Sequence, residues 1–229
     1  MRKKKKGKVS DYPRVMDARK DLKKQYKLYK QESPFTMDDY KAVKNNIKTG
    51  KAADPDGISP EVLKYCDLDE TVPQFANKRL MNLDKPDQWS ESNLVPIPKS
   101  GNLSQVSNYR GISLSQIMLK VVNRIILNRI QPILDLLLQS NQNGFRPGRS
   151  TTAQILTLRR IIEATRNLPA VLKFIDFRKA FDSINSRKML QILKAYGVPA
   201  QLVDTIGKTY GETWANVLSP DSENSSKQP

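Results

Sequence analysis

The clearest pattern in the chain is a run of regularly spaced apolar residues between Ser115 and Leu138. They follow i, i+4, i+8 spacing and comprise Ile117, Val121, Val122, Ile125, Ile126, Ile130, Ile133 and Leu137. Residues spaced in this way share one face of a helix. The pattern therefore predicts a long amphipathic helix.

Shorter helices are predicted from the residues that start and stop them. TMDD resembles a capping box with Asp in place of Glu, a Pro at the first helical position favours a start, and a Gly after the last turn favours a stop. One helix is predicted to start in TMDD (36–39), a second to start at Pro60, and a third to span about 70–83. A fourth runs from a cap at Ser150 or Thr151 to about Arg166, and two more span about 186–196 and 200–210.

Three segments have the composition of β-strands. WSESNLVPIPKS is interrupted by proline, which lacks an N–H, so it is expected to be an edge strand. SGNLSQVSN provides turn residues and YRGISLS a returning strand, which together predict a β-hairpin. AVLKFID is rich in β-branched and aromatic residues and is expected to be a buried strand. The pattern indicates a helix-rich α+β fold.

Composition excludes several kinds of site. The chain of 229 residues has one cysteine, Cys66, and no histidine, which excludes a disulfide framework, the common zinc sites and imidazole catalysis. A bound metal would have oxygen ligands, which favours Mg²⁺ or Mn²⁺. No apolar run is as long as a membrane span, so no membrane partner is expected. A reducing compartment, the nucleus or cytoplasm, is expected.

The net charge of +16 is unevenly distributed. Residues 1–30 carry 13 Lys/Arg and 3 Asp/Glu, so residues 1–35 are expected to be a basic tail or linker, either a surface helix or disordered. Residues 96–199 carry 16 basic and 4 acidic side chains in the region with the densest folding signals. A basic folded region of this kind is typical of a protein that binds a polyanion. Residues 219–229 are expected to be a polar tail or a truncated end.

Asp176 ends the predicted strand AVLKFID, the position at which sheets present functional residues. A charge at the end of a buried strand needs a partner, and a metal, a substrate and a helix cap are all candidates. Asp182 follows six residues later. It either shares a metal with Asp176 or caps the following helix, and the residues favour the cap.

Two basic pairs are candidates for binding phosphate. GFRPGRST (144–151) has the wrong spacing for a P-loop, but it presents Arg146 and Arg149 at a predicted helix start, where guanidinium and free N–H groups favour anions. The alternative is that an arginine pairs with an acidic neighbour. Lys99 and Arg110 flank the hairpin tip, where they suit a triphosphate or serve only solubility.

Five motifs together resemble the reverse transcriptase of a non-LTR (LINE-type) retrotransposon. They are GKAADPDGISPEVLK, VPIPKSG, NYRGISL, NGFRPGRST and FIDFRKAFDSI, in the family's order over about residues 36–218. The resemblance implies a right-hand polymerase fold of which residues 36–218 form the fingers and a partial palm. It also implies RNA-directed DNA polymerase ancestry.

The resemblance further implies an active site. Asp176 would be catalytic and ligate both Mg²⁺ (or Mn²⁺) ions, and the backbone carbonyl of Phe177 would face a metal. Phe181 would pack under the sugar of the incoming nucleotide and disfavour a 2′-hydroxyl. The reaction would be attack of a primer 3′-oxygen on an α-phosphorus between two metals.

The implied partners are an RNA template, a DNA primer and deoxynucleoside triphosphates. Lys99 and Arg110 would hold the triphosphate, and Arg146 and Arg149 would follow the template.

The chain also departs from the family pattern. Asp54 stands where the family usually has Gly, and Gly111 where many members have Pro. The [FY]-[AV]-D-D motif, which supplies the remaining metal carboxylates, and the QGD-like motif do not occur. We therefore expect a polymerase fragment that is inactive alone. The alternative is a non-catalytic nucleic-acid-binding remnant of a retroelement.

Overall fold

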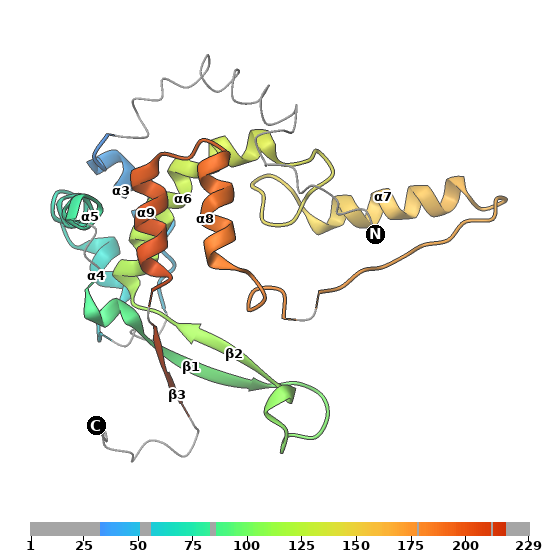
Figure 1. Cartoon of the computed structure of the whole chain (residues 1–229), viewed down its shortest axis with the longest axis horizontal. Helices are drawn as coiled ribbons and strands as arrows, with labels where there is room; N and C mark the ends of the chain where they lie inside the picture. The colour runs from blue at the N-terminus through green and yellow to red at the C-terminus, as the bar shows by residue number, and fades with distance from the viewer. Residues whose placement is uncertain (1–32, 51–55, 83–85, 178, 212, 219–229) are drawn as a thin grey trace, which may run out of the picture. The chain divides into compact units, whose positions relative to one another are not determined.

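The computed structural model describes residues 33–50, 56–82, 86–177, 179–211 and 213–218 (Figure 1). They form two compact units. The hairpin unit comprises residues 33–130 and 198–218, and the loop unit comprises residues 131–197. The tails predicted at the two ends lie largely outside the described residues, apart from 33–35.

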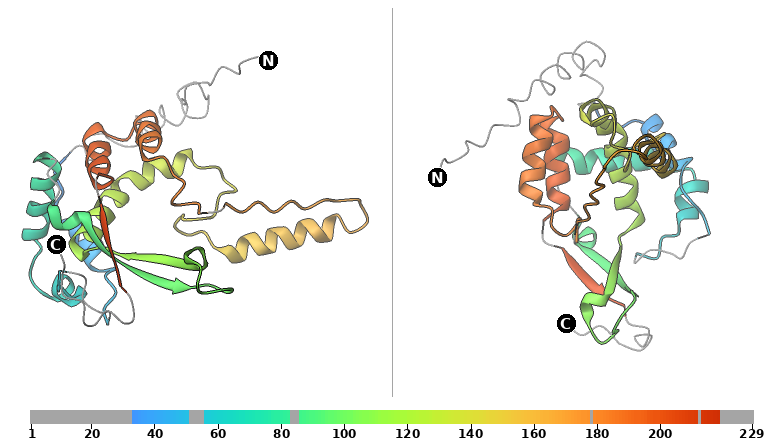
Figure 2. Two further views of the ribbon diagram at one scale, coloured as in Figure 1. Left: turned by 60° about the horizontal axis from the view of Figure 1, so that its bottom comes forward. Right: turned by 90° about the vertical axis from the view of Figure 1, so that its right-hand side faces the viewer.

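A small sheet in the hairpin unit confirms the predicted β-hairpin. Strands β1 (Glu91–Pro98) and β2 (Tyr109–Leu114) are antiparallel, and Asn93 is opposite Leu114. A third strand, β3 (Trp214–Val217), runs parallel to β1. The strand order is β2-β1-β3. In the views of Figures 1 and 2 the hairpin extends away from the helices of its unit.

The prediction that β1 is an edge strand is wrong, because β1 is the middle strand. The reason lies in the length of β3, which pairs only with Glu91–Leu94 of β1. Pro96 and Pro98 lie beyond β3, where β1 has β2 as a partner on one side only. A missing N–H costs little on the unpaired side. The prolines therefore lie in the part of β1 that has a neighbouring strand on one side only, as an edge strand does.

The helices of the hairpin unit confirm most sequence predictions. They are α3 (Met37–Lys44), α4 (Pro60–Tyr65), α5 (Thr71–Asn82), α6 (Ile117–Leu137) and α9 (Ala200–Thr209). The last turns of α6 belong to the loop unit. Short 3₁₀ turns occur at Asp87–Ser90 and Val106–Asn108. Thr36 and Asp39 form the predicted capping box of α3. Among the described residues, no helix is long and apolar enough to cross a membrane.

The core of the hairpin unit is built on the apolar face of α6. Val121, Val122, Ile125 and Ile126 are each at most 3% exposed. Further buried apolar side chains come from α3, α4, α5 and α9 and include Tyr40, Val43, Leu63, Val72, Ala76, Leu202 and Val203. Burying one such side chain is worth about 1.5–3 kcal/mol. The Tyr40 hydroxyl donates to the Leu63 carbonyl at 2.6 Å, so its polar atom is also satisfied.

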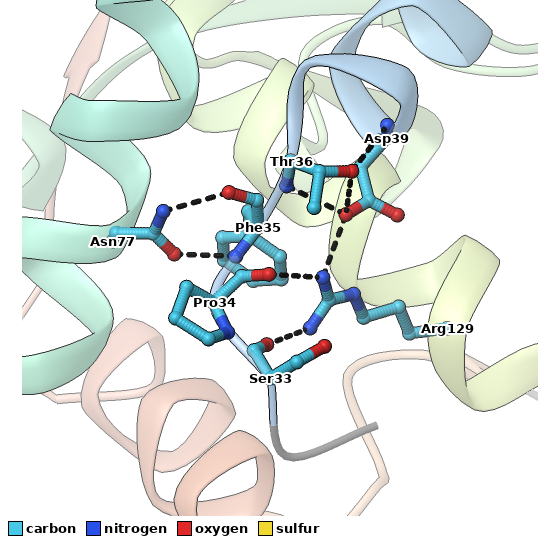
Figure 3. Close-up of polar contacts among 7 residues, drawn as sticks. All are labelled: Ser33, Pro34, Phe35, Thr36, Asp39, Asn77 and Arg129. Atoms are coloured by element: carbon cyan, nitrogen blue, oxygen red, sulfur yellow. Dashed lines mark hydrogen bonds and ion pairs between the residues drawn. The ribbon is translucent and has the colours of Figure 1, made fainter. Parts of the chain in front are cut away.

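Arg129 fastens the start of the described chain to α6 (Figure 3). Its guanidinium donates to the carbonyls of Ser33 and Pro34 and to Oδ2 of Asp39, the last at 2.6 Å. It also lies 4.4 Å from the centre of the Phe35 ring. Asn77 on α5 accepts from the Phe35 N–H and donates to the Phe35 carbonyl. We call the Arg129 contacts with residues 33–39 the Arg129 latch.

The loop unit contains α7 (Thr151–Ala164) and α8 (Ser186–Ala195). Ser150 caps α7 as predicted, since its hydroxyl accepts from the Ala153 N–H at 3.3 Å. Asn185 caps α8 by accepting from the Lys188 N–H at 3.0 Å. The prediction that Asp182 caps this helix is therefore wrong, because Asn185 occupies the cap position and Asp182 lies three residues earlier in a turn.

The prediction of a buried strand at AVLKFID is also wrong. Residues 169–177 run back alongside α7 as extended chain (Figures 1 and 2), but they form no strand. Val171 is 95% exposed and Phe174 is 79% exposed. A strand needs a neighbour for its N–H and C=O groups. Within the described residues the sheet is formed by β1, β2 and β3 alone, all in the hairpin unit.

Candidate polymerase and nucleic-acid site

The β1–β2 hairpin carries Lys99 and Arg110 close to its tip. Arg110 is opposite Ile97, and the Lys99 N–H donates to the Asn108 carbonyl at 2.7 Å, which continues the antiparallel register by two residues. Side chains alternate along a strand, so Lys99 and Arg110 lie on the same face as diagonal neighbours, whose spacing is roughly 7–8 Å. Both residues are exposed. One face of the hairpin thus carries two exposed cations near its tip.

The turn of this hairpin is held by its own asparagines. The Asn108 side chain donates to the Asn102 carbonyl at 2.7 Å, and the Asn102 side chain accepts from the Ser104 N–H at 2.9 Å. Gly101 has φ +116°, a conformation that favours glycine. These bonds give the segment that carries Lys99 a defined shape before any ligand binds.

In the GFRPGRST loop, the two arginines have different environments. The Arg146 side chain is 8% exposed and its Nε donates to Oδ1 of Asp135 at 2.8 Å. Its terminal nitrogens donate to the carbonyls of Gln139, Gln142 and Asp135. The hydrogen bond from Arg146 lowers the pKa of Asp135 below its usual value.

Arg146 therefore has the structural environment that the sequence left open as an alternative, a pairing with an acidic neighbour. Its contacts do not support the predicted binding to template, because its guanidinium is already used within the loop unit. Arg149 is exposed, and its contact with nucleic acid stays a prediction.

The same loop meets the turn that follows Asp176. The rings of Phe145 and Phe181 are in contact, with centroids 6.1 Å apart and planes at 83°. Phe145 is 94% exposed and Phe181 is 73% exposed. The structure thus brings NGFRPGRST and FIDFRKAFDSI together, although 36 positions separate the two phenylalanines in the sequence.

Asp176 and Phe177 are both exposed in the extended segment. Mg²⁺ takes about six oxygen ligands and is usually held by one or two carboxylates with water or phosphate. In the described part of the chain, no three acidic or cysteine side chains lie close enough together to hold a metal ion. One exposed carboxylate does not make a complete site for two metals, so these residues alone do not fit the metal pair that the family resemblance implies.

A separate cavity of about 690 Å³ lies at the base of the hairpin. Its wall includes Asp56, Glu91, Phe75 and Trp89. Two carboxylates make this cavity unsuitable for a phosphate group. The hairpin tip, which carries the two cations, is the better candidate for an anion.

Two features of this site were missed in the sequence. The partner of Arg146 is Asp135, eleven positions earlier, and an acidic neighbour was considered without being identified. Phe145 lies within the NGFRPGRST motif, and the motif alone predicts no role for its side chain. An aromatic residue in a loop between two glycines, Gly144 and Gly148, was the available signal.

Comparison with known proteins identifies the family. Residues 97–227 match the model of the family described as reverse transcriptase (RNA-dependent DNA polymerase). A Pol polyprotein from the type-2 retrotransposable element R2DM of Drosophila melanogaster is 28% identical over 78% of this chain. The transposon TX1 149 kDa protein of Xenopus laevis is 24% identical over 78% of the chain. A probable RNA-directed DNA polymerase from transposon BS of Drosophila melanogaster is 34% identical over 43% of the chain.

The helix-rich fold with its small sheet is compatible with a polymerase domain, and the matched region contains the end of β1, the hairpin tip, β2, the GFRPGRST loop and Asp176. The chain belongs to the reverse transcriptase family, and within it to the non-LTR, LINE-type retrotransposon enzymes. It spans 17% of the R2DM polyprotein, 14% of the TX1 protein and 12% of the transposon BS protein.

Proposed function

We propose that this chain provides the fingers and the first part of the palm of an RNA-directed DNA polymerase that copies retrotransposon RNA. The observation that carries the proposal is the hairpin, whose register puts Lys99 and Arg110 on one face at a fixed tip. Two cations on one face suit the phosphates of an incoming deoxynucleotide, because charge-assisted bonds to phosphate are strong. The proposed partners are an RNA template, a DNA primer and deoxynucleoside triphosphates.

The remaining residues of the loop unit are assigned to the template and the sugar. Arg149 is exposed near the start of α7 and contacts the template backbone in our proposal. Phe181 packs against the sugar of the incoming nucleotide. Arg146 acts indirectly, because its bond to Asp135 holds the loop that carries Arg149.

Reverse transcriptases use divalent metal ions, and Asp176 is the carboxylate that this chain would contribute to such a site. Among the described residues, the exposed Asp176 does not belong to a group of three or more acidic or cysteine side chains that could hold a metal ion. We therefore propose that the chain does not extend a primer by itself. The same observation favours a second candidate function, a nucleic-acid-binding remnant that binds RNA without turnover.

The test measures binding and primer extension on one preparation of the full chain. Fluorescence anisotropy with a labelled single-stranded RNA and with an RNA–DNA primer–template gives the affinity between 50 and 300 mM KCl. Neutralising about six phosphates gives a slope of log affinity against log salt of about −4 on single strands. Extension is assayed with Mg²⁺ and with Mn²⁺, and none is expected.

Charge variants locate the interface. Arg149→Ala should reduce the salt slope by about 0.7, the contribution of one phosphate contact on a single strand. Lys48→Ala is the matched control, since Lys48 is an exposed cation in the acidic part of the sequence. An affinity independent of salt, or no binding at low salt, would refute both candidate functions. Extension by the unmodified chain would refute the proposal that it is inactive alone.

A further inference from the structure

We propose that Phe145 is a stacking surface for an unpaired nucleobase and that Phe181 holds the Phe145 ring in place. This inference rests on the proposed nucleic-acid binding and adds the feature of the ligand that is recognised. It predicts that the chain distinguishes single strands that have bases from strands that have only a sugar–phosphate backbone.

The first observation is the conformation of Phe145. Its φ is +58°, in the left-handed region that residues with a side chain rarely adopt. The residue is 94% exposed, so burial of its side chain does not explain the conformation. Unfavourable backbone conformations that the surrounding structure maintains are concentrated at functional sites.

The second observation is the set of contacts that maintains the left-handed conformation of Phe145. The next residue, Arg146, is fixed by Asp135 and by three backbone carbonyls. The Arg149 N–H donates to the Arg146 carbonyl at 3.3 Å, which closes the loop on its other side. Arg146 thus anchors the loop while the neighbouring ring points to solvent.

The third observation is the contact with Phe181. The two ring planes meet at 83°, an edge-to-face arrangement that is favourable for aromatic pairs. The turn that carries Phe181 is closed by backbone bonds from Ser183 to Lys179 and from Ile184 to Phe181, at 3.0 and 3.2 Å. An edge-to-face pair favours one orientation of the two rings, and the high exposure of both residues leaves ring faces open to solvent.

The charge of the loop unit indicates a nucleobase as the occupant. Residues 131–197 carry 11 basic and 4 acidic side chains. Arg149 and Lys179, both exposed, lie four and two positions from the two rings in sequence. Open aromatic faces beside cations are the combination that binds single-stranded nucleic acid, since each base stacks on a ring while the cations contact its phosphates. Inside a duplex the base faces are already stacked on each other, so a paired strand does not offer them.

The experiment compares two labelled RNA strands of equal length and charge, one with bases and one with several central abasic sites. The wild-type chain should bind the first at least about 10-fold more tightly. Phe145→Ala should lose most of that difference while keeping the salt slope, and Phe145→Trp should keep it. A 2-aminopurine in the central position should show a fluorescence change on binding that Phe145→Ala reduces.

Phe174→Ala is the matched control, because Phe174 is 79% exposed in the same unit. Phe145→Gly, which relieves the left-handed strain, should behave as Phe145→Ala if the ring is what matters. Equal affinity of the wild type for both strands, or a Phe145→Ala variant that still distinguishes them, would overturn the inference and leave the proposed function standing. A wild-type chain that binds neither strand at low salt would overturn both. A loss for Phe174→Ala equal to that for Phe145→Ala would overturn the assignment to this pair.

Discussion

Replacing Arg129 with alanine should strongly destabilise the hairpin unit. The Arg129 side chain is 8% exposed, and its guanidinium bonds to Asp39 and to the carbonyls of Ser33 and Pro34. Partial burial raises the pKa of Asp39, but the bonds from Arg129 and from the Thr36 N–H outweigh it, so this pKa lies below its usual value. Asp39 is therefore a charged partner that the substitution leaves behind.

The expected loss of unfolding free energy follows from these contacts. A hydrogen bond to a charged group contributes about 1.5–3 kcal/mol, and a partly desolvated cation–π contact, here with Phe35, about 0.5–2 kcal/mol. The Asp39 side chain is 27% exposed, so water partly replaces its lost partner. We expect Arg129→Ala to lower the free energy of unfolding by about 3 kcal/mol. Arg129→Lys keeps the charge but lacks the planar fork, so it should lose about half as much.

Urea unfolding followed by tryptophan fluorescence measures this change in the hairpin unit. Trp89 is buried there, with its ring 5.8 Å from that of Phe75, and so reports on this core. Arg124→Ala is the matched control, because Arg124 is an exposed arginine on the same helix. It should change the free energy by less than about 0.5 kcal/mol. An Arg129→Ala variant as stable as Arg124→Ala would show that the latch contributes nothing.

Two further predictions concern the pKa of Asp135 and the cap of α3. The folded pKa of Asp135 is lowered, so its bond to Arg146 stabilises the loop unit above the ordinary carboxyl pKa of about 3.9 and is lost as the pH falls through the lowered value. The difference in unfolding free energy between wild type and Asp135→Asn should therefore shrink below about pH 4, and a constant difference would contradict it. Thr36→Ala removes the oxygen that accepts from the Asp39 N–H and should cost about 1 kcal/mol in urea unfolding, whereas Thr36→Ser should cost much less.

The features that the sequence predicted well depend on local information. The bounds of α6 follow from apolar spacing and the start of α7 from its cap, and the caps at Thr36 and Ser150 need only a side chain that reaches an N–H three residues ahead. The hairpin was predictable for the same reason, since its two strands are close in sequence. Local rules failed where two residues competed for one role, as with Asp182 and Asn185.

The position of β1 in the sheet could not be derived from β1 itself. Its prolines correctly indicated that part of the strand has one neighbour, but the neighbour on the other side, β3, comes more than 110 positions later. The role of Arg146 could not be derived from its own motif either. An arginine in a loop can bind a phosphate or an internal carboxylate, and which of the two it binds depends on which is nearby. The motif did not show that Asp135 would be there.

AVLKFID shows most clearly what a sequence pattern does not determine. Its residues favour an extended conformation, but they do not specify which strand the segment pairs with. The segment is extended in the structure, as its β-branched and aromatic residues favour, yet its backbone is not paired in a sheet. The expected cost of placing Asp176 at the end of a buried strand therefore does not arise in this arrangement, since the carboxylate is exposed and hydrated. The sequence left open which partner stabilises that charge, and in the described structure the carboxylate faces solvent. The metal role that we propose for Asp176 would therefore require further carboxylates to be brought to it, because the segment that carries it supplies only one exposed carboxylate at this position.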